Sequence, residues 1–396
     1  MRIIILLLLI SSDFLAQTYN NSDYTFSDNL LSTKGGHGIS EELSYIGEYK
    51  MALTYLDHSE QKMPKISSED SIHFANFKPI DALDYLKETA SKEKVIIINE
   101  AHHQPYHRIF TIKLLKTLYE KGFRYFGAET LSSWDTLLNK RKYPIQNTGY
   151  YTREPLYADL IRTALDLGYT VFSYETNSIR PDSAGINFRE IEQAKNIKKV
   201  MTTNPDGKFL IHCGYDHLVE TDYPGWGKAM AGRLTEITGV NPFTIDQVRL
   251  TERSSVDYEN PYFKVINLNY FAFFIDSVGN LFKGSKNYNP GYDVRLYHPR
   301  TKFENGRPNW MFDNNRNPYF INDSIKITFP CLIFAYLENE ISSVLTKDES
   351  PIPYDIIELK NKAEKKALSL KPGKYKIIIR SKKNKLQYID VNIKLN

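Results

Sequence analysis

A regular alternation of apolar runs and amphipathic segments marks the middle of the chain. Residues 94–100 form a continuous β-branched run, which is typical of a strand buried on both faces. Apolar residues recur at helical spacing over 105–121, and Gly122 ends this pattern. Strands that alternate with helices predict an α/β fold with a largely parallel central sheet flanked by helices. Further strands are predicted at 124–129, 170–175, 208–213 and 242–248, and further helices at 81–91, 156–167, 187–201 and 227–237.

The alternation stops after about residue 248. Turn-forming residues such as Gly279 and Gly306 punctuate the segment that follows. Near the C-terminus, strand patterns over 374–379 and 386–395 flank a lysine-rich turn, which predicts a β-hairpin with a charged tip. One helix is also predicted near the N-terminus, over 40–56. We therefore divide the chain into a signal peptide at 1–16, an N-terminal helical or irregular segment at 17–78, an α/β domain at 79–258, and a smaller C-terminal β-rich domain, a sandwich, at 260–396.

The first residues have the pattern of a signal peptide. Arg2 precedes an apolar run over 3–10, and Ala16 offers a small residue for cleavage before Gln17. Because this run is too short to span a hydrocarbon core of about 30 Å as a helix, cleavage is favoured over an uncleaved anchor. No later apolar run in the sequence reaches transmembrane length. The mature protein is therefore expected to be soluble, to have no transmembrane segment, and to be exported to the periplasm or secreted.

Composition and charge narrow the function classes. The chain has 51 Lys and Arg residues against 47 Asp and Glu residues, and a net charge of +4 is too balanced for a nucleic-acid-binding protein. Cys213 and Cys331 both lie in apolar strand patterns, so we interpret them as buried small hydrophobic residues rather than a disulfide framework. The lysines between 360 and 385 are interpreted as a solvated face, with a patch for an anionic surface as the alternative.

Acidic and histidine residues follow consecutive predicted strands of the sheet. In parallel α/β sheets, sites form outside the carboxyl ends of the strands. A helix cap or a satisfied buried histidine would explain any one of these residues, but the joint pattern favours a functional site. The residues are Glu100, His102 and His103 after the first strand, Glu129 after the second, Glu175 after the third, and Asp216 and His217 after the fourth. We expect one cleft at this edge, lined by the side chains of His102, Glu129, Glu175 and His217.

Three short motifs resemble those of a known superfamily. They are Asn-Glu-Ala-His-His at 99–103, Gly-Phe-Arg-Tyr-Phe-Gly-Ala-Glu-Thr at 122–130 and Gly-Tyr-Asp-His at 214–217. Together they resemble the erythromycin-esterase-like, TIKI and ChaN (haem-binding uptake) superfamily, over roughly residues 80–250. The resemblance implies that His102, Glu129 and His217 form the core of the site. It also implies that Glu100 belongs to the first motif.

The segment 189–197 resembles a further family feature, which implies that Arg189 and Asn196 face the site. A buried cluster of acids needs a cation or shared protons, because like charges raise each other's pKa. The planar guanidinium of an arginine meets this need well. We therefore predict that Arg189 pairs with Glu129 or Glu175.

The first motif departs from the family pattern at its first residue. Asn99 stands where the family has glycine, whereas the motif at 214–217 keeps its glycine, Gly214. Asparagine adopts positive φ most readily after glycine, so we expect the turn to be kept. Because the superfamily is functionally diverse, the resemblance predicts the fold more directly than a particular reaction.

Two function classes compete, and the first is a hydrolase of a small-molecule or peptide substrate. In the esterase-like branch, His102 would be the general base and Glu129 its partner, with no metal. In the TIKI-like branch, His102, Glu129 and His217 would hold a divalent metal that lowers the pKa of bound water. The residues leave this choice open. The sequence contains neither an H-E-x-x-H metal motif nor a G-x-S-x-G serine motif.

The second class is a carrier of haem or another ligand, as the ChaN branch implies. Haem ligation would need histidine or tyrosine, and the candidates are His103, Tyr106, His107 and Tyr215. We assign cofactor binding to His103, Tyr215 and Asn196. A degenerate site that serves only as a scaffold is the third alternative. His212 lies within a predicted strand and is expected to be structural.

Overall fold

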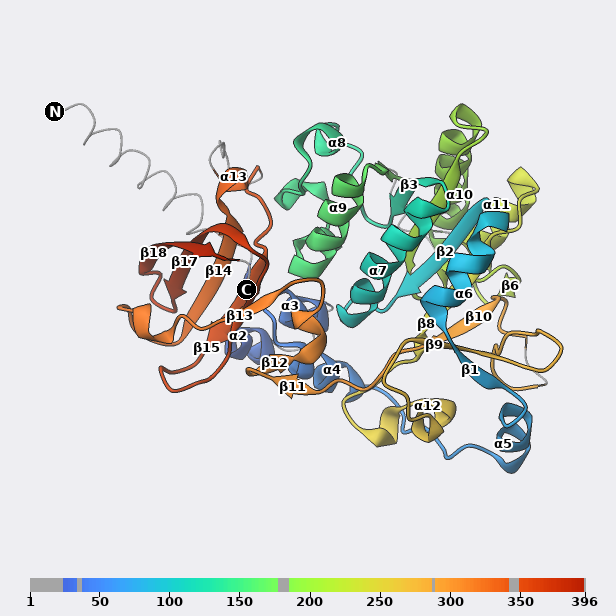
Figure 1. Cartoon of the computed structure of the whole chain (residues 1–396), viewed down its shortest axis with the longest axis horizontal. Coiled ribbons are helices and arrows are strands. Elements are labelled where there is room, and N and C mark those ends of the chain that lie inside the picture. Colours follow the sequence, from blue (N-terminus) through green and yellow to red (C-terminus); the bar gives the residue numbers. More distant parts are fainter. Residues whose placement is uncertain (1–23, 34–37, 177–184, 287–288, 342–348, 395–396) are drawn as a thin grey trace. The chain divides into compact units, whose positions relative to one another are not determined.

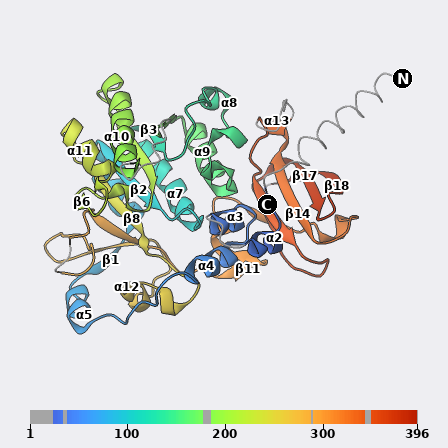
Figure 2. The same ribbon diagram turned by 180° about the vertical axis from the view of Figure 1, so that it is seen from behind.

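The computed structural model describes residues 24–33, 38–176, 185–286, 289–341 and 349–394. These residues fall into two compact units. The sheet unit consists of Leu56–Lys142 and Leu160–Thr301, and the terminal unit consists of Tyr143–Asp159 with the described parts of Met1–Tyr55 and Lys302–Asn396. Figures 1 and 2 show the chain from opposite sides. The predicted signal peptide at 1–16 lies outside the described residues.

The sheet unit is built on an eight-stranded, mostly parallel sheet. Its order is β1 (Lys78–Asp81), β9 (Ala272–Ile275), β10 (Val294–Tyr297), β8 (Phe243–Leu250), β2 (Val95–Glu100), β5 (Lys208–Gly214), β3 (Phe123–Ala128) and β4 (Thr170–Ser173). Neighbouring strands from β10 to β4 run parallel, whereas β9 is antiparallel to both β1 and β10. The central strand β2 is buried along its whole length, as its continuous apolar run predicted. This arrangement confirms the predicted α/β fold.

Helices cover both faces of this sheet. α10 (Gly185–Thr203) and α11 (Met230–Thr238) pack on one face, where their apolar residues form a core with alternate residues of β2 and β5. α6 (Ala82–Thr89) and α7 (Tyr106–Glu120) lie on the other face (Figures 1 and 2). α11 begins later than predicted, because Gly227–Lys228 pairs with Asp222–Tyr223 as the short strands β7 and β6. The carboxyl ends of the parallel strands all lie at one edge of the sheet, between these two layers of helices.

The terminal unit contains a four-stranded antiparallel sheet. Its order is β15 (Asp355–Leu359), β14 (Cys331–Leu337), β17 (Gly373–Ser381) and β18 (Leu386–Ile393). β17 and β18 form the predicted hairpin, with Lys382 and Lys385 in the turn. One face of the sheet packs on α2 (Ser27–Ser32), α3 (Ile39–Tyr45) and the start of α4 (Tyr49–Asp57), and the other packs on β16 (Leu368–Leu370). Helices therefore cover one face of the four-stranded sheet, and the two-stranded sheet of β16 and β13 (Asn317–Tyr319) lies on the other.

Several shorter elements complete the two units. The helices are α5 (Ser68–Phe74), α8 (Leu138–Arg141), α9 (Pro155–Leu167), α12 (Pro261–Val265) and α13 (Glu338–Ile341), and the strands are β11 (Phe303–Glu304), β12 (Arg307–Pro308) and β13 (Asn317–Tyr319). Cys213 and Cys331 are free and buried, as predicted. Among the described residues, no helix combines the length and the apolar character that a membrane crossing needs.

Two segments fold differently from their sequence pattern. The helix predicted over 40–56 is split into α3 and α4 at Gly47, which has a φ of 76°. A Cβ at this glycine would lie 2.5 Å from the carbonyl oxygen of Ile356, so both the backbone angle and the close approach require glycine. β9 and β10 fall after residue 260, in the segment expected to belong to the β-rich domain, and they pair within the large sheet.

Candidate active site

A buried series of charged side chains holds His102 at the carboxyl end of β2. Arg108, on α7, donates two hydrogen bonds of 2.7 Å to the Glu100 carboxylate and one of 2.8 Å to the His102 carbonyl oxygen. Oε1 of Glu100 lies 3.0 Å from Nδ1 of His102. Burial alone would raise the pKa of Glu100, but Arg108, together with His212 and His102, outweighs it and holds that pKa well below its ordinary range. The ionised carboxylate therefore accepts the Nδ1 proton, which assigns proton transfer to Nε2.

His102 and Glu129 converge on Gly214, the last residue of β5. A Cβ at Gly214 would lie 2.4 Å from Nε2 of His102 and 2.9 Å from Oε2 of Glu129. The N–H of Gly214 donates a hydrogen bond to the same Oε2. The φ of Gly214 is −88°, an angle that any residue adopts. The motif at 214–217 therefore needs glycine at its first position, because two side chains meet where a Cβ would stand.

Arg189, on α10, joins the acidic side chains, which confirms its predicted pairing. Its Nη2 lies 2.7 Å from Oε1 of Glu129 and 2.6 Å from Oε2 of Glu175. Burial alone would raise the pKa of Glu129, but His217, His102 and Arg189 outweigh it and lower that pKa to about 2. The side chain of Arg189 is 26% exposed, against 4% for Glu129. Arg189 and Glu175, whose side chain is 19% exposed, are therefore the members of this group that meet solvent.

His217 follows Gly214 by one helical turn and is fixed by a buried glutamate. Its Nδ1 lies 2.7 Å from Oε1 of Glu190, whose other oxygen accepts the Met230 N–H at 2.7 Å. Its Nε2 lies 3.0 Å from Nη1 of Arg189 and 3.5 Å from Oε1 of Glu129. Burial alone would lower the pKa of His217, but Glu129 and Glu190 outweigh it and raise that pKa. The motifs at 99–103 and 214–217 thus come together around Arg189 and Gly214.

The backbone is strained beside two of these residues. Thr130 directly follows Glu129 with a φ of 58°, and Tyr215 directly follows Gly214 with a φ of 40°. The left-handed region is rare for a β-branched residue, and each such angle costs about 1–3 kcal/mol. Strain of this kind persists where surrounding contacts hold the chain in place, and it gathers at functional sites.

Asn99 corrects one expectation from the motif comparison. It does not form a positive-φ turn; it lies inside β2, where its side chain links neighbouring segments. Nδ2 donates to the Tyr215 carbonyl at 2.7 Å and to Asp246 at 2.9 Å, and Oδ1 accepts the Gln247 N–H at 2.8 Å. Asn99 therefore stabilises the strained turn at Tyr215 through its side chain and does not form a turn of its own.

Three of the four candidate haem ligands, His103, Tyr106 and His107, lie inside the fold, whereas Tyr215 is half-buried. Nδ1 of His107 accepts the N–H of Ala101 at 2.9 Å, and Nδ1 of His103 lies 3.3 Å from the Tyr215 hydroxyl. Burial lowers the pKa of His103 to about 3, so its ring is neutral at physiological pH. Both histidines are at most 1% exposed, and Tyr106 is 7% exposed. Rings enclosed in this way do not fit axial ligation of a haem.

The tentative metal set also departs from what a metal needs. Among the described residues, no three His, Cys, Asp or Glu side chains are arranged to hold a metal ion. Nδ1 of His217 is bound to the Glu190 carboxylate. The other ring nitrogen, Nε2, would face the metal, but the guanidinium of Arg189 lies 3.0 Å from it. A guanidinium at this position repels a divalent cation. The observed arrangement of His102, Glu129 and His217 therefore does not fit a shared metal.

Sequence reasoning missed three residues that hold the site together: Arg108, Glu190 and Gln193. Gln193 donates to both oxygens of Glu175 at 3.1 and 3.2 Å, and it stands one helical turn after Arg189. That spacing was a usable signal, because residues at i and i+4 share a helix face. Asn196 acts on the backbone instead, donating to the carbonyls of Tyr174 and Glu175.

Comparisons with known proteins give only distant similarities. No family model matches the sequence, and no curated protein matches it. The type III effector HopBA1 is 12% identical, with 46% of this chain and 87% of that chain covered and a TM-score of 0.31. RRSP, a MARTX toxin effector domain from Vibrio vulnificus, is 17% identical (60% and 43% covered, TM-score 0.30), and haem-binding ChaN of Campylobacter jejuni is 11% identical (50% and 96% covered, TM-score 0.29). Each of these TM-scores is below 0.5, so the similarities assign no function to this chain.

Proposed function

We propose that the protein is a hydrolase that activates water with His102 and needs no metal for this step. The observation that carries the proposal is the buried Arg108–Glu100–His102 series, which fixes Nδ1 of the imidazole and directs Nε2 toward Gly214 and Glu129. A histidine oriented by an ionised carboxylate is suited to general base catalysis. The motif resemblance to the erythromycin-esterase-like members of the superfamily supports the same assignment.

The proposed reaction is the attack of water on an ester or amide carbonyl. As the water oxygen bonds to the carbonyl carbon, its proton moves to Nε2 of His102. Glu100, at Nδ1, stabilises the imidazolium that forms, and Arg189 supplies positive charge for the developing oxyanion. When the tetrahedral intermediate collapses, the bond to the leaving group breaks and the leaving group takes the proton from His102. His217 and Glu190 act as positioning residues that hold Arg189 in place.

Exposure indicates how a substrate would approach. His102, Glu129 and His217 are each at most 6% exposed, whereas the side chains of Arg189 and Glu175 are 26% and 19% exposed. We therefore place the entrance on the side of Arg189. The signal-peptide pattern at 1–16 supports a reaction outside the cytoplasm, on a small-molecule or peptide substrate.

A hydrolysis screen with two added arms tests this proposal. Purified protein is offered ester, amide and peptide substrates before and after treatment with a chelator, and haemin is titrated separately. We expect hydrolysis of at least one substrate class at a rate that the chelator does not change. In the haemin titration, we expect no shift of the haem absorption band. Activity that is lost with the chelator and restored by Zn²⁺ would support the metal-dependent branch instead. A specific haem complex without hydrolysis of any substrate would replace the hydrolase with the carrier.

A further inference from the structure

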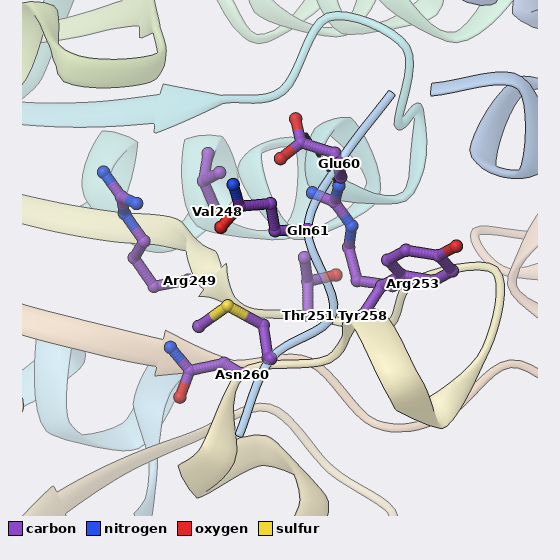
Figure 3. A pocket seen from close by; sticks show the side chains of 9 residues that line it. Glu60, Gln61, Val248, Arg249, Thr251, Arg253, Tyr258 and Asn260 are labelled. Atoms are coloured by element: carbon purple, nitrogen blue, oxygen red, sulfur yellow. Dashed lines mark ion pairs between the residues drawn. The ribbon is translucent and has the colours of Figure 1, made fainter. Parts of the chain in front are cut away.

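Two small pockets adjoin at the carboxyl end of β8, within the sheet unit. The first has a volume of about 160 Å³, and Figure 3 shows Arg249 and Asn260 at one end of it and Arg253 and Tyr258 at the other. The second has a volume of about 170 Å³ and is lined by Asp216, Tyr292 and Arg295, among others. Arg249 and Asn260 line both pockets, so the two spaces meet at these side chains.

Two of the three arginines in these pockets have carboxylate partners. Arg253 is held by Asp57, whose carboxylate is 2% exposed and lies 2.5 Å from Nη2. Arg249 donates to Oδ1 of Asp216 at 2.9 Å, and the other oxygen of Asp216 accepts the Tyr223 hydroxyl at 2.5 Å. The charges of Asp57 and Asp216 are therefore compensated within the protein.

Arg295, on β10, is different. It is 7% exposed, and its Nε donates to the Tyr292 hydroxyl at 2.7 Å. Within the described residues, its guanidinium has no carboxylate partner. Its two terminal nitrogens lie 2.8 Å from the position that a Cβ of Gly284 would take, so the glycine makes room for the guanidinium. A buried charge without a partner is costly, which indicates that a ligand completes the site.

We infer that the second pocket binds a small oxyanion, a carboxylate or a phosphate group, between Arg295 and Arg249. A guanidinium offers two parallel N–H donors that match the oxygens of either group. Tilted ring contacts connect the pocket with the candidate active site: the ring centroids of Tyr223 and Trp226 lie 4.9 Å apart, and those of Trp226 and His217 lie 5.1 Å apart. An acidic substrate of the hydrolase would use this pocket as its anchor. That last step rests on the proposed function, whereas anion binding itself does not.

Thermal melting in defined anions tests the inference without any assay of hydrolysis. Wild-type protein is melted in inorganic phosphate, in sodium acetate and in sodium chloride, all at the same ionic strength. A bound anion stabilises the folded state by mass action, so phosphate or acetate should raise the Tm by roughly 2–4 °C above chloride. A rise with phosphate alone identifies a phosphoryl group, and a rise with acetate identifies a carboxylate. Equal Tm values in all three salts would overturn the inference.

Matched variants locate the effect. Arg295→Gln should abolish the anion-dependent rise, whereas Arg124→Gln, the same change at the amino end of β3, should keep it. Arg249→Gln, whose side chain is 48% exposed, should reduce the rise and serves as the second pocket variant if Arg295→Gln does not fold. A full rise in Arg295→Gln, or in Arg249→Gln where only that variant folds, would also contradict the site. Loss of hydrolysis with intact anion binding would count against the proposed function alone.

Discussion

Buried arginines pair with carboxylates in both units of the molecule, but their surroundings differ. In the terminal unit, Arg307 donates to both oxygens of Asp355 at 3.0 and 3.1 Å, and Arg316 donates to Asp159 at 2.8 Å. All four side chains are at most 3% exposed. Asp355 also accepts the N–H of Ser369 at 2.7 Å. None of these four side chains is an imidazole, and the cluster links segments that are distant in sequence.

In the sheet unit, Arg189 forms a cluster with Glu129, Glu175, His102 and His217. This cluster is partly open to solvent and contains titratable imidazoles. His217 contacts Arg189 directly, and His102 approaches Glu129 across Gly214. The cluster also adjoins the strained Thr130. The difference teaches that a buried ion pair alone does not mark a functional site. A functional site is instead indicated by the combination of titratable groups, a solvent-exposed member and a strained backbone at the strand ends.

The largest expected effect belongs to the terminal unit. Asp355→Ala leaves the buried guanidinium of Arg307 without its carboxylate, so we expect unfolding free energy to fall by about 3–5 kcal/mol. Activity per folded molecule should not change. Chemical denaturation, with hydrolysis measured below the transition, checks both parts. Lys376→Ala, which breaks the exposed pair with Asp390, is the control and should cost at most about 1 kcal/mol. Similar losses in both variants would remove the structural role assigned to the buried cluster.

The next effect is the response of the sheet unit to acid. The pKa of Glu129 is about 2 in the folded protein against an ordinary value of 4.5. Its contribution to stability is therefore fully present above pH 4.5 and is lost as the pH falls through about 2, and it amounts to roughly 3 kcal/mol. Glu129→Gln should flatten the pH dependence of unfolding free energy in this window. A slope between pH 4.5 and 2 as steep as in wild type would mean that Glu129 is not held ionised.

Gly214→Ala should act on catalysis more than on stability. The added methyl group would stand 2.4 Å from the His102 ring, so the ring has to move. A displacement of about 1 Å costs on the order of a hundredfold in rate. We expect this loss mainly in kcat, with KM nearly unchanged. Gly279→Ala, at a turn where a Cβ would meet no atom within 4 Å, is the comparison variant; its φ of 95° should cost the protein some stability, but it should keep wild-type rates. Wild-type kcat in Gly214→Ala would separate His102 from the reaction.

Much of the fold could be predicted because its signals are local. The β-branched run of β2 and the helical spacing of α7 sufficed to predict a parallel sheet. β9 and β10 were not recognised as parts of that sheet, since four residues each give no periodic pattern. The break at Gly47 was missed because the backbone of Ile356, which requires it, is remote in sequence.

The candidate site was predictable where the sheet topology alone determines which residues lie close together. Parallel strands end at one edge, so His102, Glu129 and His217 could be expected together. The pairing of Arg189 followed from the need to neutralise buried acids. The partners of the two histidines were not predictable, because Arg108 and Glu190 lie on helices whose orientation depends on packing. The role of Asn99 also depends on the neighbouring strand β8.

The most direct test of the central claim compares His102→Ala with His212→Ala in hydrolysis and in melting. His102 lies just past β2 in a turn, whereas His212 is fully buried inside β5, and burial lowers its pKa to about 4. We predict that His102→Ala loses hydrolysis by about 10²–10⁴-fold while the protein stays folded, with a Tm lowered by the loss of the buried contact to Glu100. His212→Ala should lose about 1–3 kcal/mol of stability and keep most of its activity per folded molecule, because Arg108 still holds Glu100, which lies 3.5 Å from Nε2 of His212. A folded His102→Ala protein that hydrolyses substrate at the wild-type rate would contradict the account.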